Sequence, residues 1–262
     1  MIRLHTKEAT ITQGRITICC ELNLSVKTGQ TWGILGANGS GKTTLLHTLA
    51  GLHPVQQGEI WLNEKKIKNL SPRTIAQSIA ILFQDFTDTF PQTVWDYCKA
   101  ARFPHLAYFK KASRHDWDVV TEALQAVDLY SLATRSITHL SGGEKRRLAL
   151  ASVLSQTPHI YLLDEPTNHL DVRHQIDVLS HFQRLVTNQS AAVVMSLHDV
   201  NLAQLFCTHI LLLYPDGQTI QGCTQEILTT ANLSSLYQHE ITPIHSPNGM
   251  YWQPKSGITK TI

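Results

Sequence analysis

The residues whose types and spacing best suit chemistry lie in one glycine-rich stretch near the start of the chain. Residues 36–44 read Gly-Ala-Asn-Gly-Ser-Gly-Lys-Thr-Thr and match G-x-x-x-x-G-K-[ST], the pattern of a loop that cradles phosphate groups. Backbone N–H groups can turn onto a phosphate here, because glycine carries no Cβ to block the approach. Lys42 can reach the β- and γ-phosphates, and the Thr43 hydroxyl can hold Mg²⁺. We therefore expect a nucleoside triphosphate to bind at Gly36, Asn38, Gly39, Ser40, Gly41, Lys42, Thr43 and Thr44.

Two adjacent acids follow an apolar run at residues 160–163, which reads as a buried strand. Asp164 suits coordination of Mg²⁺ through water, and Glu165 can face the γ-phosphate and polarise an attacking water molecule. Carboxylates at the end of a buried strand are costly unless a metal or a proton transfer uses them. That cost argues against a purely structural pair. A polar loop just beyond carries one more acid, Asp171.

Two further polar residues, Gln84 and His198, stand just past the ends of apolar runs at residues 79–83 and 191–197. In open α/β sheets, ligands bind beyond the carboxyl ends of the strands. The Gln84 amide is thus placed to touch a metal or water, and the His198 imidazole to hydrogen-bond a γ-phosphate. Either residue alone would read as an ordinary loop residue, so their interest depends on sharing one sheet edge with Glu165.

A second helix start suited to an anion lies at Ser141-Gly142-Gly143-Glu144. Ser141 is a natural N-cap, and the two glycines leave the amides of the first turn bare. This site has no lysine of its own. By itself the stretch could equally be an ordinary capped helix.

Apolar runs alternating with helical patterns predict an α/β fold with an inserted helical lobe. Residues 1–30 alternate apolar and polar, which indicates antiparallel strands with one wet face. Thr93 and Ser113 resemble N-caps that open helices in the lobe. The expected apolar face of the second lobe helix carries Trp117, Val120, Leu124 and Val127. Strands are expected at residues 31–35, 58–62, 79–83, 160–163, 191–197 and 210–213. Residues 224–262 are expected to contain two short helical stretches and a polar tail.

Composition excludes several classes of protein. The 262 residues are 42% apolar, which is enough for a core, and no uncharged apolar stretch approaches the length of a bilayer span. Residues 1–5 lack the apolar core of a signal peptide, so we expect a cytosolic chain or one held at a membrane by a partner. A net charge of +2 without a basic run gives no footprint for nucleic acid. Five scattered cysteines fit neither zinc nor a disulfide frame, and we expect buried reduced thiols.

In their fixed order these motifs resemble the ATP-binding subunit of ABC transporters, over roughly residues 2–225. The most specific element is Leu-Ser-Gly-Gly-Glu, which begins 24 residues before Asp164. The resemblance implies the ABC ATPase fold: an α/β P-loop ATPase core with an N-terminal antiparallel β subdomain and an inserted helical subdomain. We expect a single domain over residues 1–262, with the core in 1–84 and 158–225, the helical subdomain in 85–157, and a C-terminal extension in 226–262.

The resemblance also implies a mechanism. Two copies would face each other head to tail, with each ATP between the Lys42 loop of one copy and Ser141, Gly142 and Gly143 of the other. Asp171 would lie across the dimer seam. Glu165 would be the general base, His198 would hold the γ-phosphate, and Gln84 would sense Mg²⁺. The implied cofactors are ATP and Mg²⁺, with Thr43, Gln84 and Asp164 as metal ligands.

Membrane partners follow from the same resemblance. Residues 85–102 of the helical subdomain would form the groove for a polytopic permease, and a substrate-binding protein would act indirectly. The chain would then sit peripherally at the cytoplasmic face of the inner membrane and bind no nucleic acid. Three short stretches resemble the ATPases of siderophore, haem and cobalamin importers, which suggests a metal-chelate cargo: residues 101–105, 164–171 and 171–175.

One departure and several alternatives stand beside this interpretation. Such subunits usually stack an aromatic residue on adenine near position 13, but this chain has Gln13 there and no Phe, Tyr or Trp in residues 1–31. Trp32, the nearest aromatic, is expected in the core. The alternatives are a soluble ABC ATPase of DNA repair or translation, which usually has paired ATPase units or a long coiled coil, and an exporter ATPase, normally fused to membrane helices. An unrelated P-loop kinase or GTPase is disfavoured by Leu-Ser-Gly-Gly-Glu.

Overall fold

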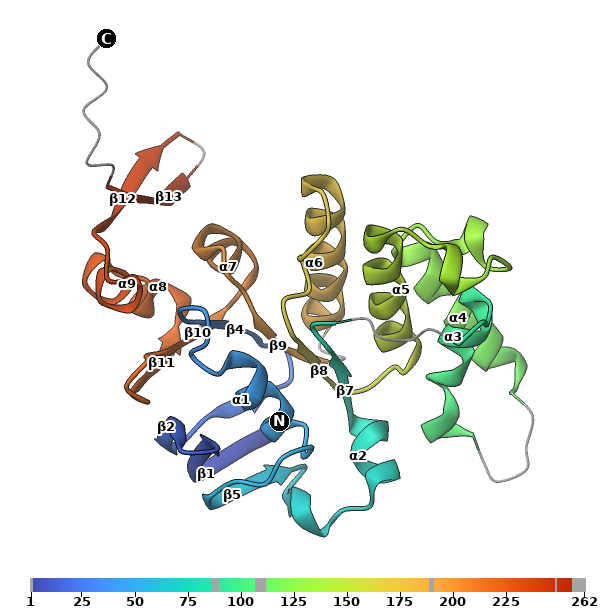
Figure 1. The fold of residues 1–262 in the computed structure, drawn as a ribbon, viewed down its shortest axis with the longest axis horizontal. Coiled ribbons are helices and arrows are strands. Elements are labelled where there is room, and N and C mark those ends of the chain that lie inside the picture. The colour runs from blue at the N-terminus through green and yellow to red at the C-terminus, as the bar shows by residue number, and fades with distance from the viewer. Residues whose placement is uncertain (1, 86–89, 107–111, 189–190, 248, 256–262) are drawn as a thin grey trace.

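The computed structural model describes residues 2–85, 90–106, 112–188, 191–247 and 249–255. Its strands form a six-stranded sheet, a five-stranded sheet and a C-terminal hairpin (Figure 1). Helices cover both faces of the six-stranded sheet. Two hydrophobic clusters fill the space on its two faces, because successive residues of each strand point to opposite sides.

The six-stranded sheet is parallel except at β11, which pairs antiparallel with β10. The apolar runs predicted the five parallel strands, and these predictions are confirmed. β11 was not expected, because its Thr-Ile-Gln-Gly-Cys sequence has little apolar character. In spatial order the strands are β11 (Thr219–Cys223), β10 (His209–Leu213), β4 (Thr31–Leu35), β9 (Ala192–Ser196), β8 (Ile160–Leu163) and β7 (Ile79–Leu82).

The carboxyl ends of the five parallel strands lie at one edge of this sheet, and several predicted site residues follow these ends. Gly36 follows β4, Gln84 follows β7, Asp164 follows β8 and His198 follows β9. Residues far apart in the chain are thereby brought together by strand pairing alone.

The five-stranded sheet is antiparallel and is built mainly from the first 30 residues, as their alternating pattern predicted. Leu4, Ala9 and Ile11 of its long first strand are fully buried on the face toward the rest of the molecule. The strands are β1 (Ile2–Gln13), β2 (Ile16–Leu22), β3 (Ser25–Lys27), β5 (Gln57–Leu62) and β6 (Lys65–Lys66).

Helix α1 (Lys42–Leu49) lies between the two sheets (Figure 1). Leu45, Leu46 and Leu49 are fully buried in the cluster that both sheets share. This packing holds the first turn of α1 against the phosphate loop. The other face of the parallel sheet is covered by α6 (Val172–Thr187) and α7 (Val200–Phe206), while α2 (Pro72–Ser78) leads into β7 with Ser71 as its N-cap.

The inserted lobe is helical, as expected. It contains α3 (Val94–Ala100), α4 (Arg114–Ala126) and α5 (Gly142–Ser155), capped by Thr93, Ser113 and Ser141 respectively. The predicted apolar face of α4 is wrong at Trp117. That side chain is half exposed and packs on Trp95, with ring centroids 5.3 Å apart, instead of entering the core.

A buried arginine locks the lobe together. Arg102 donates to the Asp116 carboxylate at 3.0 Å, to the Ser155 carbonyl at 2.8 Å and to the Thr157 hydroxyl at 2.7 Å. His105 Nε2 lies 2.8 Å from the Gln156 carbonyl oxygen. The stretch at residues 101–105, which resembles importer ATPases, therefore has a local structural role in joining the end of α3 to α4 and α5.

The C-terminal region contains more structure than the sequence suggested. The two short helices are present as α8 (Thr224–Ile227) and α9 (Thr230–Tyr237). The expected polar tail instead forms a hairpin of β12 (Ile241–Ser246) and β13 (Gly249–Pro254), seen beyond α9 in Figure 1. The hairpin docks on α7 through Trp252, whose N–H groups donate to Asn201 and Gln204. A proline and several polar residues hide this strand pair in the sequence.

The cysteines only partly match expectation. All five are free thiols. Cys19, Cys98 and Cys207 are buried, whereas Cys20 and Cys223 are exposed, so the prediction of uniformly buried thiols is wrong for two of them. Burial raises the pKa of Cys98 and of Cys207 to about 12, which keeps both as inert thiols. Among the residues described, the structure holds no helix with the length and apolar content that crossing a bilayer requires.

Candidate active site

A cavity of about 520 Å³ at the carboxyl edge of the parallel sheet gathers most of the predicted site residues. Its lining joins the phosphate loop to residues at three strand ends. It consists of Gln13, Asn38, Gly39, Gly41, Lys42, Thr43, Thr44, Gln84, Glu165 and His198. Ser141, Gly142, Gly143 and Asp171 lie outside this lining, as do Gly36, Ser40 and Asp164. Gly36 and Asp164 nevertheless accept hydrogen bonds from the lining residues Lys42 and Thr43, respectively. Most of the phosphate loop thus shares one cavity with Gln84, Glu165 and His198. The start of α5 and Asp171 lie elsewhere on the surface of the chain.

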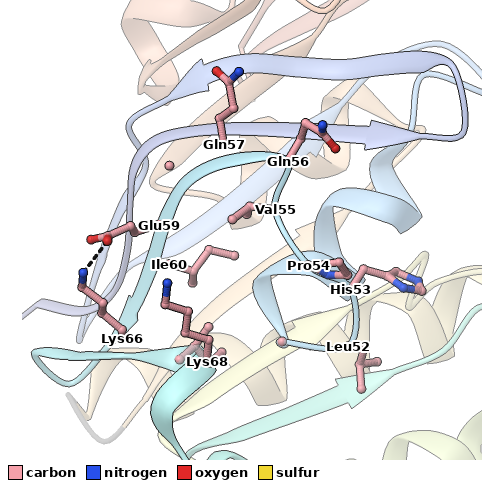
Figure 2. A pocket seen from close by; sticks show the side chains of 13 residues that line it. Leu52, His53, Pro54, Val55, Gln56, Gln57, Glu59, Ile60, Lys66 and Lys68 are labelled. Atoms are coloured by element: carbon pink, nitrogen blue, oxygen red, sulfur yellow. Dashed lines mark hydrogen bonds and ion pairs between the residues drawn. The ribbon is translucent and has the colours of Figure 1, made fainter.

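A larger cavity of about 650 Å³ lies between the turn after α1 and strands β5 and β6 (Figure 2). Its lining mixes apolar side chains, such as Leu52, Val55 and Ile60, with the polar and charged side chains of His53, Gln56, Gln57, Glu59, Lys66 and Lys68. Glu59 and Lys66 point toward one another there and form an ion pair. Size alone does not decide between the two cavities. We place the chemistry in the smaller one, because only that cavity combines a glycine-rich loop with a carboxylate and an imidazole.

The phosphate loop has a backbone that only glycine allows at key points. Gly39 and Gly41 have φ of 78° and 96°, and a Cβ on Gly41 would lie 2.4 Å from Ile18 Cγ2. Lys42 Nζ donates to the carbonyls of Gly36 at 2.9 Å and Ala37 at 3.1 Å. Burial lowers the pKa of Lys42, and the nearby charges of Glu165 and Asp164 act in the opposite direction. The ammonium group is therefore held at the rim of the loop beside two carboxylates.

The expected magnesium ligands Thr43 and Asp164 are in direct contact. The Thr43 hydroxyl donates to Asp164 Oδ2 at 2.6 Å, and the Ser196 hydroxyl donates to Oδ1 at 2.6 Å. Asp164 is fully buried. Thr43 and Gln84 line the cavity, and the buried Asp164 carboxylate lies directly behind the Thr43 hydroxyl. Hydroxyl, carboxylate and amide oxygens are the hard donors that Mg²⁺ prefers, so these residues fit the ion.

Glu165 is surrounded by side chains that fix both of its carboxylate oxygens. Oε1 lies 2.6 Å from His198 Nε2, and Oε2 accepts from Gln84 Nε2 at 3.2 Å and from the Asn168 amide. The backbone N–H of Glu165 donates to Ser196 Oγ at 2.8 Å. The predicted neighbours Gln84 and His198 thus both contact Glu165, which lies 8% exposed at the cavity wall.

Three residues that support this site were missed in the sequence: Asn168, Ser196 and Arg146. Asn168 read as part of a polar loop, although an amide three residues after an acid could have been noticed. Ser196 ends the neighbouring strand β9 and donates to Asp164, and a serine inside an apolar run was an available signal. Arg146 lies on α5, and its guanidinium donates to four backbone carbonyls near the site. Its neighbours Lys145 and Arg147 are also basic, so the sequence does not distinguish Arg146 as a residue that supports the site.

The start of α5 has the predicted capped geometry. The Ser141 N–H donates to Glu144 Oε2 at 2.6 Å, and Ser141 Oγ accepts from the Glu144 N–H at 3.3 Å. A Cβ at Gly142 would meet nothing within 4 Å, so this turn is open to solvent. The surface is thus free to receive a group from outside the chain.

Asp171 is exposed and caps α6. It accepts from the His174 N–H at 2.9 Å, and the hydrogen bonds from His174 lower the pKa of Asp171. The carboxylate therefore stays charged on the surface beside the loop that follows Glu165.

Gln13 lies where an adenine-stacking ring was expected in the family pattern. Its Oε1 accepts from the Thr44 hydroxyl at 2.9 Å, which ties the β1–β2 turn to the first turn of α1. Trp32 is 5% exposed and stacks on His209, with ring centroids 4.7 Å apart. The expectation that Trp32 belongs to the core is confirmed.

Comparison with known proteins agrees with this geometry. A family model described as "ABC transporter" matches residues 19–168. The ferric enterobactin transport ATP-binding protein FepC of Escherichia coli is 34% identical over 90% of this chain and 87% of its own length. The hemin import ATP-binding protein HmuV of Thermobifida fusca is 35% identical over 93% of this chain and 85% of its own length.

Solved structures of ABC transporter proteins are also similar to this chain. A metal-chelate type ABC transporter in an inward-facing conformation superposes with a TM-score of 0.84 and 29% identity, covering 98% of this chain and 99% of the other. The ATP-binding cassette MJ0796, solved as a dimer with ADP and Pi in a post-hydrolysis state, gives a TM-score of 0.74 at 26% identity. It covers 84% of this chain and 98% of its own.

Proposed function

The chain belongs to the ABC transporter family as an ATP-binding subunit that hydrolyses ATP, and we propose that it powers import of a metal chelate through a membrane permease. The observation that carries the assignment of the site is the meeting of the Lys42 loop, Glu165 and His198 around one cavity. The cargo class is supported by relatives whose names specify ferric enterobactin, petrobactin and hemin.

We propose a task in hydrolysis for each side chain of the cavity. Loop amides and Lys42 bind the phosphates of ATP, and Glu165 takes a proton from the attacking water. His198, in contact with Glu165 and 42% exposed in its side chain, is free to donate to the γ-phosphate as well. Thr43, Asp164 and Gln84 would hold Mg²⁺, and the bound ion would neutralise charge on the phosphate oxygens.

The remaining residues complete the site of a second copy. Gly142 and Gly143 place their N–H groups in the first turn of α5 beside the Ser141 N-cap, which favours an anion, yet all three residues lie outside their own chain's cavity. In a head-to-tail dimer they close the γ-phosphate side of the partner's ATP, and Asp171 lies at the seam. The dimeric state of a cassette similar to this chain supports the arrangement.

Transport across the membrane would require partner proteins. We propose that the chain sits peripherally at the cytoplasmic face of the inner membrane, bound to polytopic permease subunits and acting indirectly with a substrate-binding protein. The expected permease groove at residues 85–102 falls partly outside the described residues, because 86–89 are not described. Likeness to an exporter, at 22% identity, shows the fold alone.

Two experiments test this function. The chain should co-purify with a polytopic membrane protein and should not be retained on immobilised nucleic acid. Deletion of the gene should impair uptake of a ferric siderophore, haem or cobalamin, and restoring the wild-type gene should recover it. Normal uptake of all three, with the associated permease shown to carry another solute, would refute the metal-chelate assignment.

A further inference from the structure

Arg146 lies one turn into α5 and reaches under the catalytic edge of the parallel sheet. We propose that Arg146 is a positioning residue for hydrolysis, whose guanidinium holds the backbones of Gln84 and Glu165 in the arrangement that makes Glu165 a competent base. The proposal rests on the proposed function of this site and adds to it a residue that never touches the nucleotide.

The contacts of Arg146 converge on the ends of two neighbouring strands. One terminal nitrogen donates to the carbonyls of Phe83 at 2.7 Å and Gln84 at 3.0 Å, beyond β7. The other donates to the carbonyls of Asp164 at 2.5 Å and Glu165 at 2.6 Å, beyond β8. One planar group therefore spans both strand ends at the point where they give way to the catalytic loops.

The surroundings of Arg146 suit a planar, charged guanidinium group. Arg146 is 3% exposed, and burial lowers its pKa, while the charges of Asp164, Glu165 and Asp85 oppose that shift. Four carbonyl dipoles point at the two terminal nitrogens of the buried cation and replace the water that these nitrogens have lost, whereas the buried Nε has no hydrogen-bond partner among the described residues. A lysine keeps the charge but cannot make two parallel pairs of hydrogen bonds from a planar group.

Glu165 needs such support because of its backbone. It has φ of 48°, which is in the left-handed region that a non-glycine residue enters only when its surroundings hold it there. Fixing the carbonyl of Glu165 fixes the direction of its side chain toward His198. Fixing the carbonyl of Gln84 keeps its amide 3.2 Å from Glu165 Oε2. Without the Arg146 guanidinium, the side chains of Glu165 and Gln84 are no longer held in place. A displacement of about 1 Å can lower the rate about a hundredfold.

Arg147 supplies a matched control on the next position of the same helix. Its guanidinium also donates to two backbone carbonyls, those of Val127 at 3.1 Å and Asp128 at 2.8 Å. Both acceptors belong to the helical lobe and lie away from the cavity. Arg147→Gln therefore removes the same kind of contact from the same helix without touching the strand ends.

The test uses mixed dimers that have one working site. A Ser141→Arg chain supplies the Lys42 loop and Glu165, and a Lys42→Ala chain supplies Ser141, Gly142 and Gly143. Arg146→Gln is introduced first into the chain with the working Glu165 and then, separately, into the chain that supplies only Ser141. Arg146→Lys and Arg147→Gln are introduced at the same places, and turnover and ATP binding are measured for each dimer.

A positioning role predicts that the loss of turnover depends on which of the two chains carries the variant. Arg146→Gln and Arg146→Lys should lower kcat by about tenfold or more when they share a chain with the working Glu165. ATP affinity should change by less than about threefold, because Lys42 and the loop amides are untouched. The same variants in the other chain, and Arg147→Gln in either chain, should leave kcat within about threefold of the parent dimer.

Other outcomes overturn the proposal. An equal loss in both chains, or a loss confined to the chain that supplies Ser141, would assign Arg146 to support of the α5 start. Joint loss of ATP binding and turnover in both Arg146 variants would show a purely structural role. If the unmodified mixed dimer is inactive while wild type hydrolyses ATP, the head-to-tail arrangement fails instead. The separate effects on kcat and ATP affinity in the wild-type background then decide the role of Arg146.

Discussion

His198 Nε2 lies 2.6 Å from Glu165 Oε1, joining the carboxyl ends of β9 and β8 across the cavity. The other oxygen of Glu165 accepts from Gln84 at 3.2 Å and from Asn168. The carboxylate is thus oriented from both sides by side chains of the same chain. That arrangement suits a group whose task is to accept a proton in one fixed direction.

Hydrolysis should depend on the carboxylate charge of Glu165. Glu165→Gln keeps the size of the side chain and removes the base, so turnover should fall by about a hundredfold or more. ATP binding should persist, and ATP should accumulate in a stable dimer. The measurement compares phosphate release and ATP binding with those of wild type. Near-normal turnover in Glu165→Gln would remove Glu165 from the role of base.

Nucleotide selectivity should reflect Gln13 in place of an aromatic ring. Base–aromatic stacking contributes roughly 1–3 kcal/mol in nucleic-acid systems, and phosphate contacts do not read the base. Wild type should therefore discriminate weakly between ATP and GTP. Gln13→Tyr should tighten ATP binding by up to about tenfold if half of that energy is recovered.

The control for this selectivity is Thr44→Val, which breaks the 2.9 Å hydrogen bond to Gln13 without adding a ring. It should not reproduce the gain in affinity. Strong preference of wild type for ATP, unchanged in Gln13→Tyr, would show that another group already holds the adenine.

The helical lobe should lose stability in acid through Asp116. Hydrogen bonds from Ser113, together with Arg102, hold the pKa of Asp116 at about 2, below its ordinary value of 3.8. A lowered pKa stabilises the fold above the unfolded value, and this contribution is lost as pH falls through about 2. Asp116→Asn should thus lower the free energy of unfolding by about 1 to 2 kcal/mol at pH 7, and by less at pH 3.

Asp118→Asn on the same helix is the matched control for acid stability, because Asp118 is exposed. Urea unfolding at several pH values gives the comparison. A deficit of Asp116→Asn that stays constant from pH 7 to pH 3 would contradict the linkage to this carboxylate.

Much of the fold was predictable because apolar runs and turn residues act locally. The runs before Gly36, Gln84, Asp164 and His198 predicted four parallel strands, and parallel pairing then requires their ends to share an edge. The ordering of motifs around the cavity follows from that rule alone. Caps at Thr93, Ser113 and Ser141 were equally local signals.

The missed features depend on contacts distant in the chain. Arg146 reads as one of three basic residues on a helix, and only the packing of α5 under the strand ends turns it inward. β11 and the C-terminal hairpin are weakly apolar, and they exist because β10 and α7 offer partners. Trp117 fits a helical stripe by spacing, but Trp95 covers one side of it and solvent the other.

The central claim is that hydrolysis occurs in a site shared by two copies of this chain. Ser141→Arg blocks the half that serves the partner, and Lys42→Ala disables the phosphate loop, so each homodimer should be inactive. A mixture of the two chains should regain one composite site per mixed dimer and a corresponding share of wild-type ATPase activity. If mixed dimers form and the mixture remains as inactive as either parent, the head-to-tail account is contradicted.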